Sequence, residues 1–213
     1  DKSVMQKAMN YIKNQQKDDG RFENNGNAQF RDLNKYSAIK GVSLTAYVLI
    51  GILENDYLKT NYPVVIEKGL QFIKTKYYDI IHDGTNYEQA MTFYLYSLAG
   101  ESHQILLEKL REVAFKRDGE VYWEYKERNP SSPSIQVEVS SYVALGLIKL
   151  REYDEAKPII KFLMSRRNPK GGFETTTDTV LGLQALTEMS KALYAKDSKI
   201  NFSLKNQNNE KVL

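Results

Sequence analysis

The chain has 213 residues, of which 41% are hydrophobic and 27% charged, and these values are typical of a folded, water-soluble protein. A net charge of +3 is too balanced for a nucleic-acid-binding protein. The longest apolar run, Ala46–Leu53, is too short to cross a bilayer, which needs about 20 helical residues. No cysteine is present, which excludes disulfides, thiol nucleophiles and Cys-ligated zinc within the chain. With only two histidines, we expect no metal site and no cofactor.

The start of the chain has no leader of charged and then apolar residues. We therefore expect any secretion signal to lie outside this sequence.

Two kinds of helix alternate along the chain. Four segments repeat apolar residues at the spacing of an amphipathic helix with one face in water, and they are Met5–Ile12, Ile66–Ile73, Ile105–Val113 and Ile159–Leu163. Four others are apolar on nearly every side, which predicts burial on all sides. These segments are Leu44–Leu53, Thr92–Leu98, Val139–Leu150 and Thr179–Leu186. The alternation predicts outer amphipathic helices and inner buried ones.

The inner helices share a small hydroxyl residue two positions before a tyrosine, as in Thr45-x-Tyr47, Thr92-x-Tyr94 and Ser140-x-Tyr142. A repeat of about 40 to 50 residues with two helices in each unit indicates an array of stacked helical hairpins. The sequence therefore predicts an all-α fold with more than half of the residues in helices. It also predicts that Leu49, Leu95, Leu145 and Leu183 lie on buried inner helices.

Three loops that follow outer helices combine a glycine turn with an aromatic residue: Gln15–Phe22, Arg117–Trp123 and Arg166–Phe173. Glycine permits the left-handed end of a helix, and the aromatic ring can fold back onto the helix ends. We interpret these loops as structural devices.

The end of the chain differs from the rest, because Ile200, Phe202 and Leu204 alternate with polar residues as in a short strand. We assign residues 1–197 to the helical domain and 198–213 to the first strand of a following β-domain. Asn201 begins an Asn-Phe-Ser glycosylation sequence, which matters only in a secreted protein.

Three of these segments, taken in order, resemble the thioester-containing domain of the alpha-2-macroglobulin and complement family. They are Gly41–Ile50 (GVSLTAYVLI), Gln136–Leu145 (QVEVSSYVAL), and Gly171–Thr179 (GGFETTTDT) with the nearby Leu183–Leu186. The resemblance covers roughly residues 4 to 190. The lysine- and tyrosine-rich composition is similar to that of insect thioester-containing proteins.

The resemblance implies an α/α toroid of six helical hairpins, of which about four are present here, followed by a β-domain. The missing hairpins, and the thioester motif that they carry in the family, would lie on the N-terminal side. It also implies a secreted, extracellular parent that acts in innate immunity, by labelling microbial surfaces or by trapping proteases. The expected partners are neighbouring domains of the parent, a microbial surface or protease reached through the parent, and possibly another protein. We expect no nucleic acid and no membrane span.

The same resemblance assigns two residues to the neighbourhood of a thioester. Aligned from Asp19–Phe22, the position of the family's acyl-accepting histidine falls at Phe30, and the acidic position falls at Asp32. Phenylalanine cannot attack an acyl carbon, so a histidine-assisted route to esters is not expected.

An α/α-toroid enzyme is the alternative function. Asp18, Asp19, Glu124, Glu127, Glu138 and Asp178 could supply the paired carboxylates of a glycosidase, although Asp178 could equally cap a helix. A prenyltransferase would need a zinc-binding cysteine, and the chain has none; it also lacks the Asp-rich motif of a terpene cyclase.

We expect His82 to be an exposed loop residue, and Ser102 to cap the helix that starts near His103. The interpretation that we favour is a domain that is not itself an enzyme.

Overall fold

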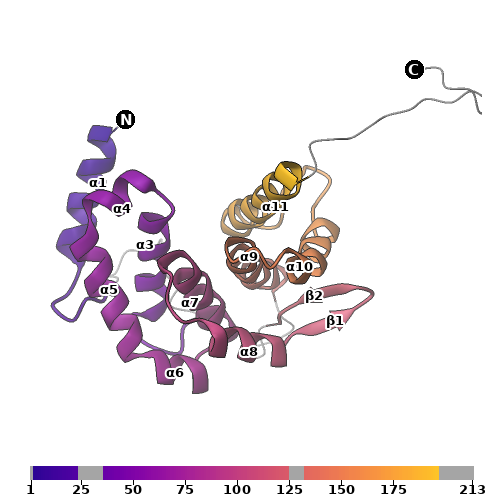
Figure 1. Ribbon diagram of the computed structural model, residues 1–213, viewed down its shortest axis with the longest axis horizontal. Coiled ribbons are helices and arrows are strands. Elements are labelled where there is room, and N and C mark those ends of the chain that lie inside the picture. Colours follow the sequence, from indigo (N-terminus) through magenta and orange to yellow (C-terminus); the bar gives the residue numbers. More distant parts are fainter. Residues whose placement is uncertain (1, 24–35, 125–131, 197–213) are drawn as a thin grey trace, which may run out of the picture.

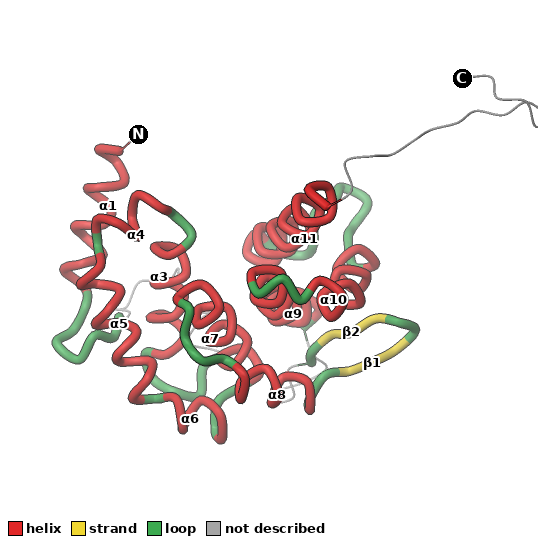
Figure 2. Tube along the Cα trace, in the orientation of Figure 1, coloured by secondary structure: helices red, strands yellow, loops and turns green. Residues whose placement is uncertain are grey.

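A computed structural model describes residues 2–23, 36–124 and 132–196 of the chain. Helices account for 71% of the described residues, which confirms the all-α prediction. Figures 1 and 2 show the helices arranged as an open arc, with α1 at one end and α11 at the other. The strand expected within residues 198–213 lies outside the described residues.

All eight helical segments expected from the sequence are present. The inner helices are α3 (Val42–Leu53), α7 (Asn86–Ala99), α9 (Pro133–Lys149) and α11 (Thr176–Lys196). The outer helices are α1 (Lys2–Gln15), α5 (Pro63–Thr75), α8 (Gln104–Glu112) and α10 (Tyr153–Ser165). Two short helices, α4 (Asp56–Asn61) and α6 (Tyr77–His82), and a hairpin of β1 (Phe115–Arg117) and β2 (Glu120–Tyr122) join them.

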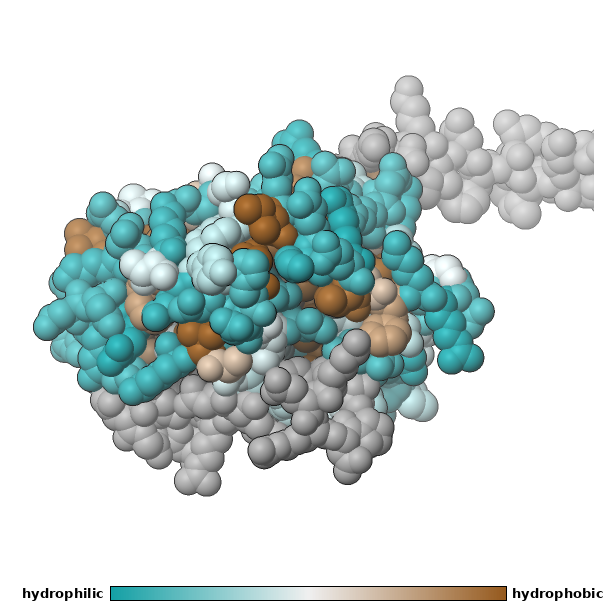
Figure 3. All heavy atoms as spheres, turned by 90° about the horizontal axis from the view of Figure 1, so that it is seen from below, coloured by the Kyte–Doolittle hydropathy of each residue, from teal (hydrophilic) through white to brown (hydrophobic). Residues whose placement is uncertain are grey.

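A simple rule describes how the helices pack. The inner helices follow one another in space, since α3 packs against α7, α7 against α9, and α9 against α11. Each of the first three inner helices also packs against the outer helix that comes after it in the chain, as α3 does with α5, α7 with α8, and α9 with α10. The face in Figure 3 is mainly hydrophilic, with hydrophobic residues gathered near its middle.

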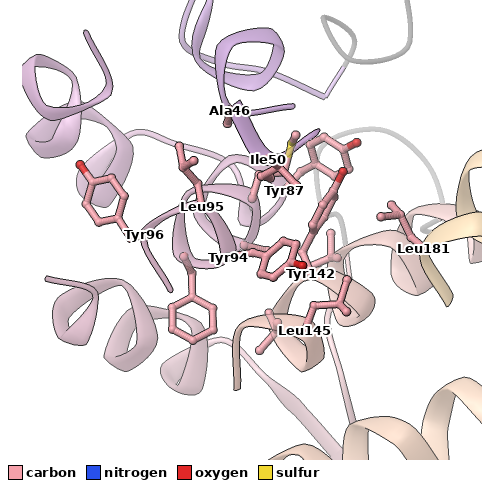
Figure 4. Packing of buried hydrophobic residues seen from close by; sticks show 14 of the residues in the cluster. Ala46, Ile50, Tyr87, Tyr94, Leu95, Tyr96, Tyr142, Leu145 and Leu181 are labelled. Atoms are coloured by element: carbon pink, nitrogen blue, oxygen red, sulfur yellow. The ribbon is translucent and has the colours of Figure 1, made fainter. Parts of the chain in front are cut away.

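The core lies between the inner helices, as the sequence predicts. Leu49 and Leu95 are fully buried and Leu145 is 2% exposed. Figure 4 shows the rings of Tyr87, Tyr94 and Tyr142 grouped near Leu95 and Leu145.

The prediction for Leu183 is wrong, because this residue of α11 is 38% exposed. In α3, Leu49 is buried against Gly69 of α5, where a Cβ atom would come within 2.9 Å of the leucine. No outer helix follows α11 in the described part of the chain, so no described helix takes the place on α11 that α5 takes on α3. Val180, on the same helix, is 59% exposed.

The three glycine–aromatic loops are structural devices, as interpreted from the sequence. Gly20, Gly119 and Gly171 all have positive φ angles, and the aromatic residues Phe22, Trp123 and Phe173 are buried. The Phe22 amide donates to Thr45 Oγ1, the Phe173 amide donates to Thr179 Oγ1, and the Trp123 indole donates to the Leu110 carbonyl. The backbone amides of Phe22 and Phe173 and the indole of Trp123 therefore bind each loop to a neighbouring helix.

The middle loop forms a β-hairpin that the sequence interpretation missed. Asp118 and Gly119 both have positive φ, at 52° and 75°, and this places them at the centre of a type I′ turn. The right-handed twist of that turn matches that of two paired strands, so the flanking residues pair as β1 and β2.

Candidate functional site

The candidate site is the segment of residues 24–35, which carries Phe30 and Asp32 and connects α1 to α3 in the sequence. Both residues lie outside the described part of the chain, as does the possible glycosylation site Asn201. The structure does describe Glu23 and Tyr36, the two residues between which this segment is attached. We call the residues on either side of the segment, 22–23 and 36–39, its first and second anchor, and their contacts show how the rest of the fold fixes its two ends.

The first anchor combines a buried ring with a charged cluster. Phe22 is 2% exposed, and its amide is fixed by Thr45 at 2.9 Å. Next to it, Glu23 Oε1 lies 2.8 Å from the Lys40 ammonium and 3.1 Å from the Arg21 guanidinium. The Lys40 ammonium, with Arg21 beside it, lowers the pKa of the Glu23 carboxyl. Glu23 is therefore a carboxylate that joins the two sides of the loop through Lys40.

The second anchor is held by a buried carboxylate on α7. Glu88 has no exposed surface, and it accepts hydrogen bonds from the Ala38 amide at 3.1 Å and the Ile39 amide at 2.9 Å. It also accepts from the Ser37 hydroxyl at 2.7 Å and from the Thr85 amide at 2.9 Å. One side chain thus fixes residues 37–39 onto the beginning of α7.

The same glutamate caps α7. The Thr85 hydroxyl lies 3.2 Å from the Glu88 amide, and the Glu88 carboxylate accepts from the Thr85 amide, which completes a capping box. The Thr85 hydroxyl also donates to the Tyr36 carbonyl at 2.8 Å. The cap of an inner helix and the end of the candidate loop therefore share one hydrogen-bond network.

Tyr36 packs against Tyr87, which forms a buried hydrogen-bonded pair with Glu138. The Tyr36 ring lies 5.9 Å from that of Tyr87, whose hydroxyl donates to Glu138 of α9 at 3.0 Å. Burial raises the pKa of Tyr87 well above its usual value, and the neighbouring Tyr142 and Glu138 add to the effect. Tyr87 is therefore neutral at physiological pH and can act as a hydrogen-bond donor.

Between the anchors the surface is hollowed into a pocket of about 390 Å³. Phe22, Glu23, Ser37, Ala38, Lys40, Gly41 and Leu44 line it. No group of three or more His, Asp or Glu side chains suited to a metal ion occurs among the described residues. The described residues on either side of segment 24–35 can fix its two ends. The chemistry expected from the sequence depends on Phe30 and Asp32, which lie within that segment.

Three of the six carboxylates considered for a glycosidase take part in structural contacts instead. Asp178 accepts from the Glu174 and Thr175 amides and so helps to cap α11, but α11 begins at Thr176 rather than at Thr179, so Asp178 acts from inside the first turn and not from the residue before the helix. Asp19 accepts from the amide and guanidinium of Arg21, and Glu138 accepts from Tyr87. Glu127 lies outside the described residues.

The two histidines also have structural surroundings. His82 is exposed, as expected, although it is the last residue of α6 rather than part of a loop, and its ring lies 4.2 Å from that of Tyr78. His103 itself stands at the N-cap position of α8, where Ser102 was expected, and its Nδ1 lies 3.0 Å from the Glu101 carbonyl.

Sequence reasoning missed Glu88, the residue that does most to fix the loop. The pattern Thr85-x-x-Glu88 is a signal for a capping box and could have identified the start of α7. Nothing local indicates that the same carboxylate binds residues 37–39, because this contact spans about 50 residues of sequence.

Comparison with known proteins agrees with this architecture. Residues 1–189 match the family described as the A-macroglobulin TED domain. The chain is 27% identical to thioester-containing protein 1 allele S1 of Anopheles gambiae over 99% of its own length and 15% of that protein. It is 29% identical to allele R1 over 91% of the chain and 14% of that protein. Complement C3 of Lethenteron camtschaticum is 30% identical over 83% of the chain and 11% of that protein.

The chain thus spans about one seventh or less of the length of these curated relatives. Within the described residues, no helix is both long and apolar enough to cross a membrane.

Proposed function

The chain belongs to the A-macroglobulin TED domain family, and we propose that it is the helical scaffold of the thioester-type domain of a secreted parent protein that acts in innate immunity. The family match over residues 1–189 carries this proposal. The contacts that fix residues 22–23 and 37–39, on either side of the segment with Phe30 and Asp32, support it, because a reactive group needs well-positioned surroundings.

In this proposal the chain itself is not an enzyme. A thioester joins a cysteine thiol to a glutamine carbonyl, and these 213 residues contain no cysteine. The acyl donor would be supplied by another part of the parent, whose neighbouring domains are the immediate partners. Labelling of a microbial surface or capture of a protease would be an action of the whole parent.

Phe30 sets the expected chemistry of such a parent. A histidine at this position could attack the acyl carbon, form an acyl-imidazole and release a thiolate that then acts as a base. Phenylalanine has no nucleophilic atom, so hydroxyl groups would gain no such help. Amines attack without it, and the parent would transfer its acyl group to amines in preference to hydroxyls.

Mass spectrometry after incubation with methylamine or glycerol tests both parts of the proposal. Residues 1–213 alone should form no adduct with either compound. The parent should form a methylamine adduct but little glycerol adduct, and the Phe30→His variant should increase glycerol transfer. A parent that forms no methylamine adduct contradicts the thioester proposal. Efficient glycerol transfer by the unmodified parent contradicts the assignment of Phe30.

A further inference from the structure

Helix α10 and the loop after it carry positive charge that no acidic residue balances. Residues 157–170 (KPIIKFLMSRRNPK) include five basic side chains and no acidic one. Lys157 pairs with Asp154 at 2.6 Å, but no carboxylate in the described part of the chain forms an ion pair with the other four. These four side chains are all exposed, and we call them the basic surface: Lys161, Arg166, Arg167 and Lys170.

Contacts with uncharged groups hold three of these side chains in place. Lys161 Nζ donates to a carbonyl in the β1–β2 turn at 2.6 Å, and Figure 1 shows this hairpin beside α10. The Arg166 guanidinium carbon lies 5.0 Å from the centre of the Phe162 ring, and Arg167 Nε donates to the Gly171 carbonyl at 3.0 Å. The cationic groups are therefore positioned but not neutralised, which lowers the entropy cost of binding an anion.

The first glycine–aromatic loop shows which of these features the fold requires. Residues 15–22 (QQKDDGRF) correspond to residues 166–173 (RRNPKGGF). In the first loop, Gln16 Nε2 donates to the Gly20 carbonyl at 2.9 Å, where the last loop uses Arg167. The backbone hydrogen bonds that close the two turns also correspond, at 2.9 Å in each case. A neutral amide thus fills the structural role, and the turn does not need the charge of the arginine.

The two loops differ most in their charge. The first loop has two basic and two acidic residues, so that its net charge is zero. The last loop has three basic residues and no acidic one. Because like charges held close together repel one another, and because the turn forms without them, the positive charge of the last loop points to a negatively charged partner.

The basic surface lies at the same end of the array as the two anchors. The first turn of α7 is bound to residues 37–39, just before α3. Tyr87, near the start of α7, donates to Glu138, near the start of α9, at 3.0 Å. The Ser134 hydroxyl in the first turn of α9 lies 3.1 Å from that of Thr175, which directly precedes α11. The starts of all four inner helices are therefore joined, and the basic loop leads into the last of them.

We propose that the basic surface binds anionic glycans, which are sugar polymers with sulfate or phosphate esters. Guanidinium groups form paired hydrogen bonds with such groups, and lysine adds positive charge. A membrane fits less well, because adsorption to a bilayer also needs apolar side chains, and Met164 is the only large hydrophobic residue exposed in this stretch. The choice of a glycan rests on the proposed function, in which the parent acts on a microbial surface.

Surface plasmon resonance of the parent on immobilised dextran sulfate, phosphomannan and neutral dextran tests the proposal. The R166Q/R167Q variant introduces the residues that the first loop has at these positions, so the turn should keep its shape. We expect the parent to bind both charged polymers but not dextran. The variant should bind them at least about fivefold more weakly at about 0.1 M salt, because each cation paired with a polyanion releases a counterion. The dependence of log affinity on log salt should become shallower by about 1.5.

The K59Q/K68Q variant is the matched control, because it removes the same charge from exposed lysines on α4 and α5. It should bind like the unmodified parent. Equal weakening in the two variants would overturn the proposal, since overall charge would then govern binding. Failure to bind either charged polymer would also overturn it, as would arginine-dependent binding only to phosphatidylglycerol vesicles. None of these measurements involves acyl transfer, so the methylamine test of the proposed function succeeds or fails separately.

Discussion

Removing the charge of Glu88 should loosen the candidate loop and destabilise the fold. In E88Q the shape of the side chain is kept, but one carboxylate oxygen becomes an NH₂ group. Glu88 Oε2 accepts from the Ala38 amide at 3.1 Å and from the Thr85 amide at 2.9 Å, so the new group places a donor opposite these two donors. The Ile39 amide and the Ser37 hydroxyl can keep the remaining oxygen.

The size of the effect follows from the number of donors left without a partner. An unsatisfied buried donor costs about 1 to 3 kcal/mol, and local relaxation recovers part of it. For two such amides we expect the free energy of unfolding to fall by roughly 2 to 4 kcal/mol.

Urea denaturation measures this loss, and hydrogen exchange at Ala38 and Ile39 shows whether it is local. E67Q is the control, because Glu67 is exposed on α5 and its substitution should change stability by less than about 0.5 kcal/mol. If E88Q unfolds within that margin of the wild type, with unchanged exchange at both amides, the glutamate does not anchor the loop.

Three further results are expected. Burial raises the pKa values of Tyr87 and Tyr142 well above 10, so these two tyrosines should leave stability unchanged up to about pH 10 and lower it above that by about 1.4 kcal/mol per pH unit for each tyrosine. Circular dichroism during an alkaline titration checks this, and tyrosinate absorbance that rises fully before unfolding would contradict it. W123F should lose about 1 kcal/mol with the indole hydrogen bond to Leu110, measured by urea denaturation, and an unchanged midpoint would argue against that bond. Arg111 binds Glu155 through two contacts at 2.7 and 2.6 Å on the surface, so a double-mutant cycle should give a coupling below about 1 kcal/mol that weakens with salt. A larger, salt-independent coupling would mean that the pair is shielded from water.

Apolar periodicity predicts the helices of this fold well, because it depends on one segment at a time. All eight segments are helical, and Leu49, Leu95 and Leu145 are buried. Leu183 belongs to an equally apolar segment but is exposed, because burial also depends on which neighbours are present. The apolar character of a helix therefore predicts that it needs neighbouring helices to bury its surface. It does not predict whether those neighbours are present in this chain.

The hairpin and the loop anchor show two other limits of sequence interpretation. Asp118-Gly119 is a strong local signal for a two-residue hairpin turn, and it was interpreted only as the end of a helix. Glu88 is different, because its bonds to Ala38 and Ile39 depend on how distant hairpins stack. The turn can be predicted from its local sequence, whereas the contacts of Glu88 with distant residues cannot be predicted until the fold is known.

Nearest-neighbour packing also explains where this array is least stable. In a stacked array each unit gains stability mainly from the units beside it, so the terminal helices gain least. Among the described side chains of α1 only Met9 is buried, Val4 is 63% exposed, and Val180 and Leu183 of α11 are also exposed. A hydrogen bond from Gln184 of α11 to Glu54 at the end of α3, at 2.7 Å, joins the two ends of the arc. This bond is exposed and contributes little, since water competes for both groups.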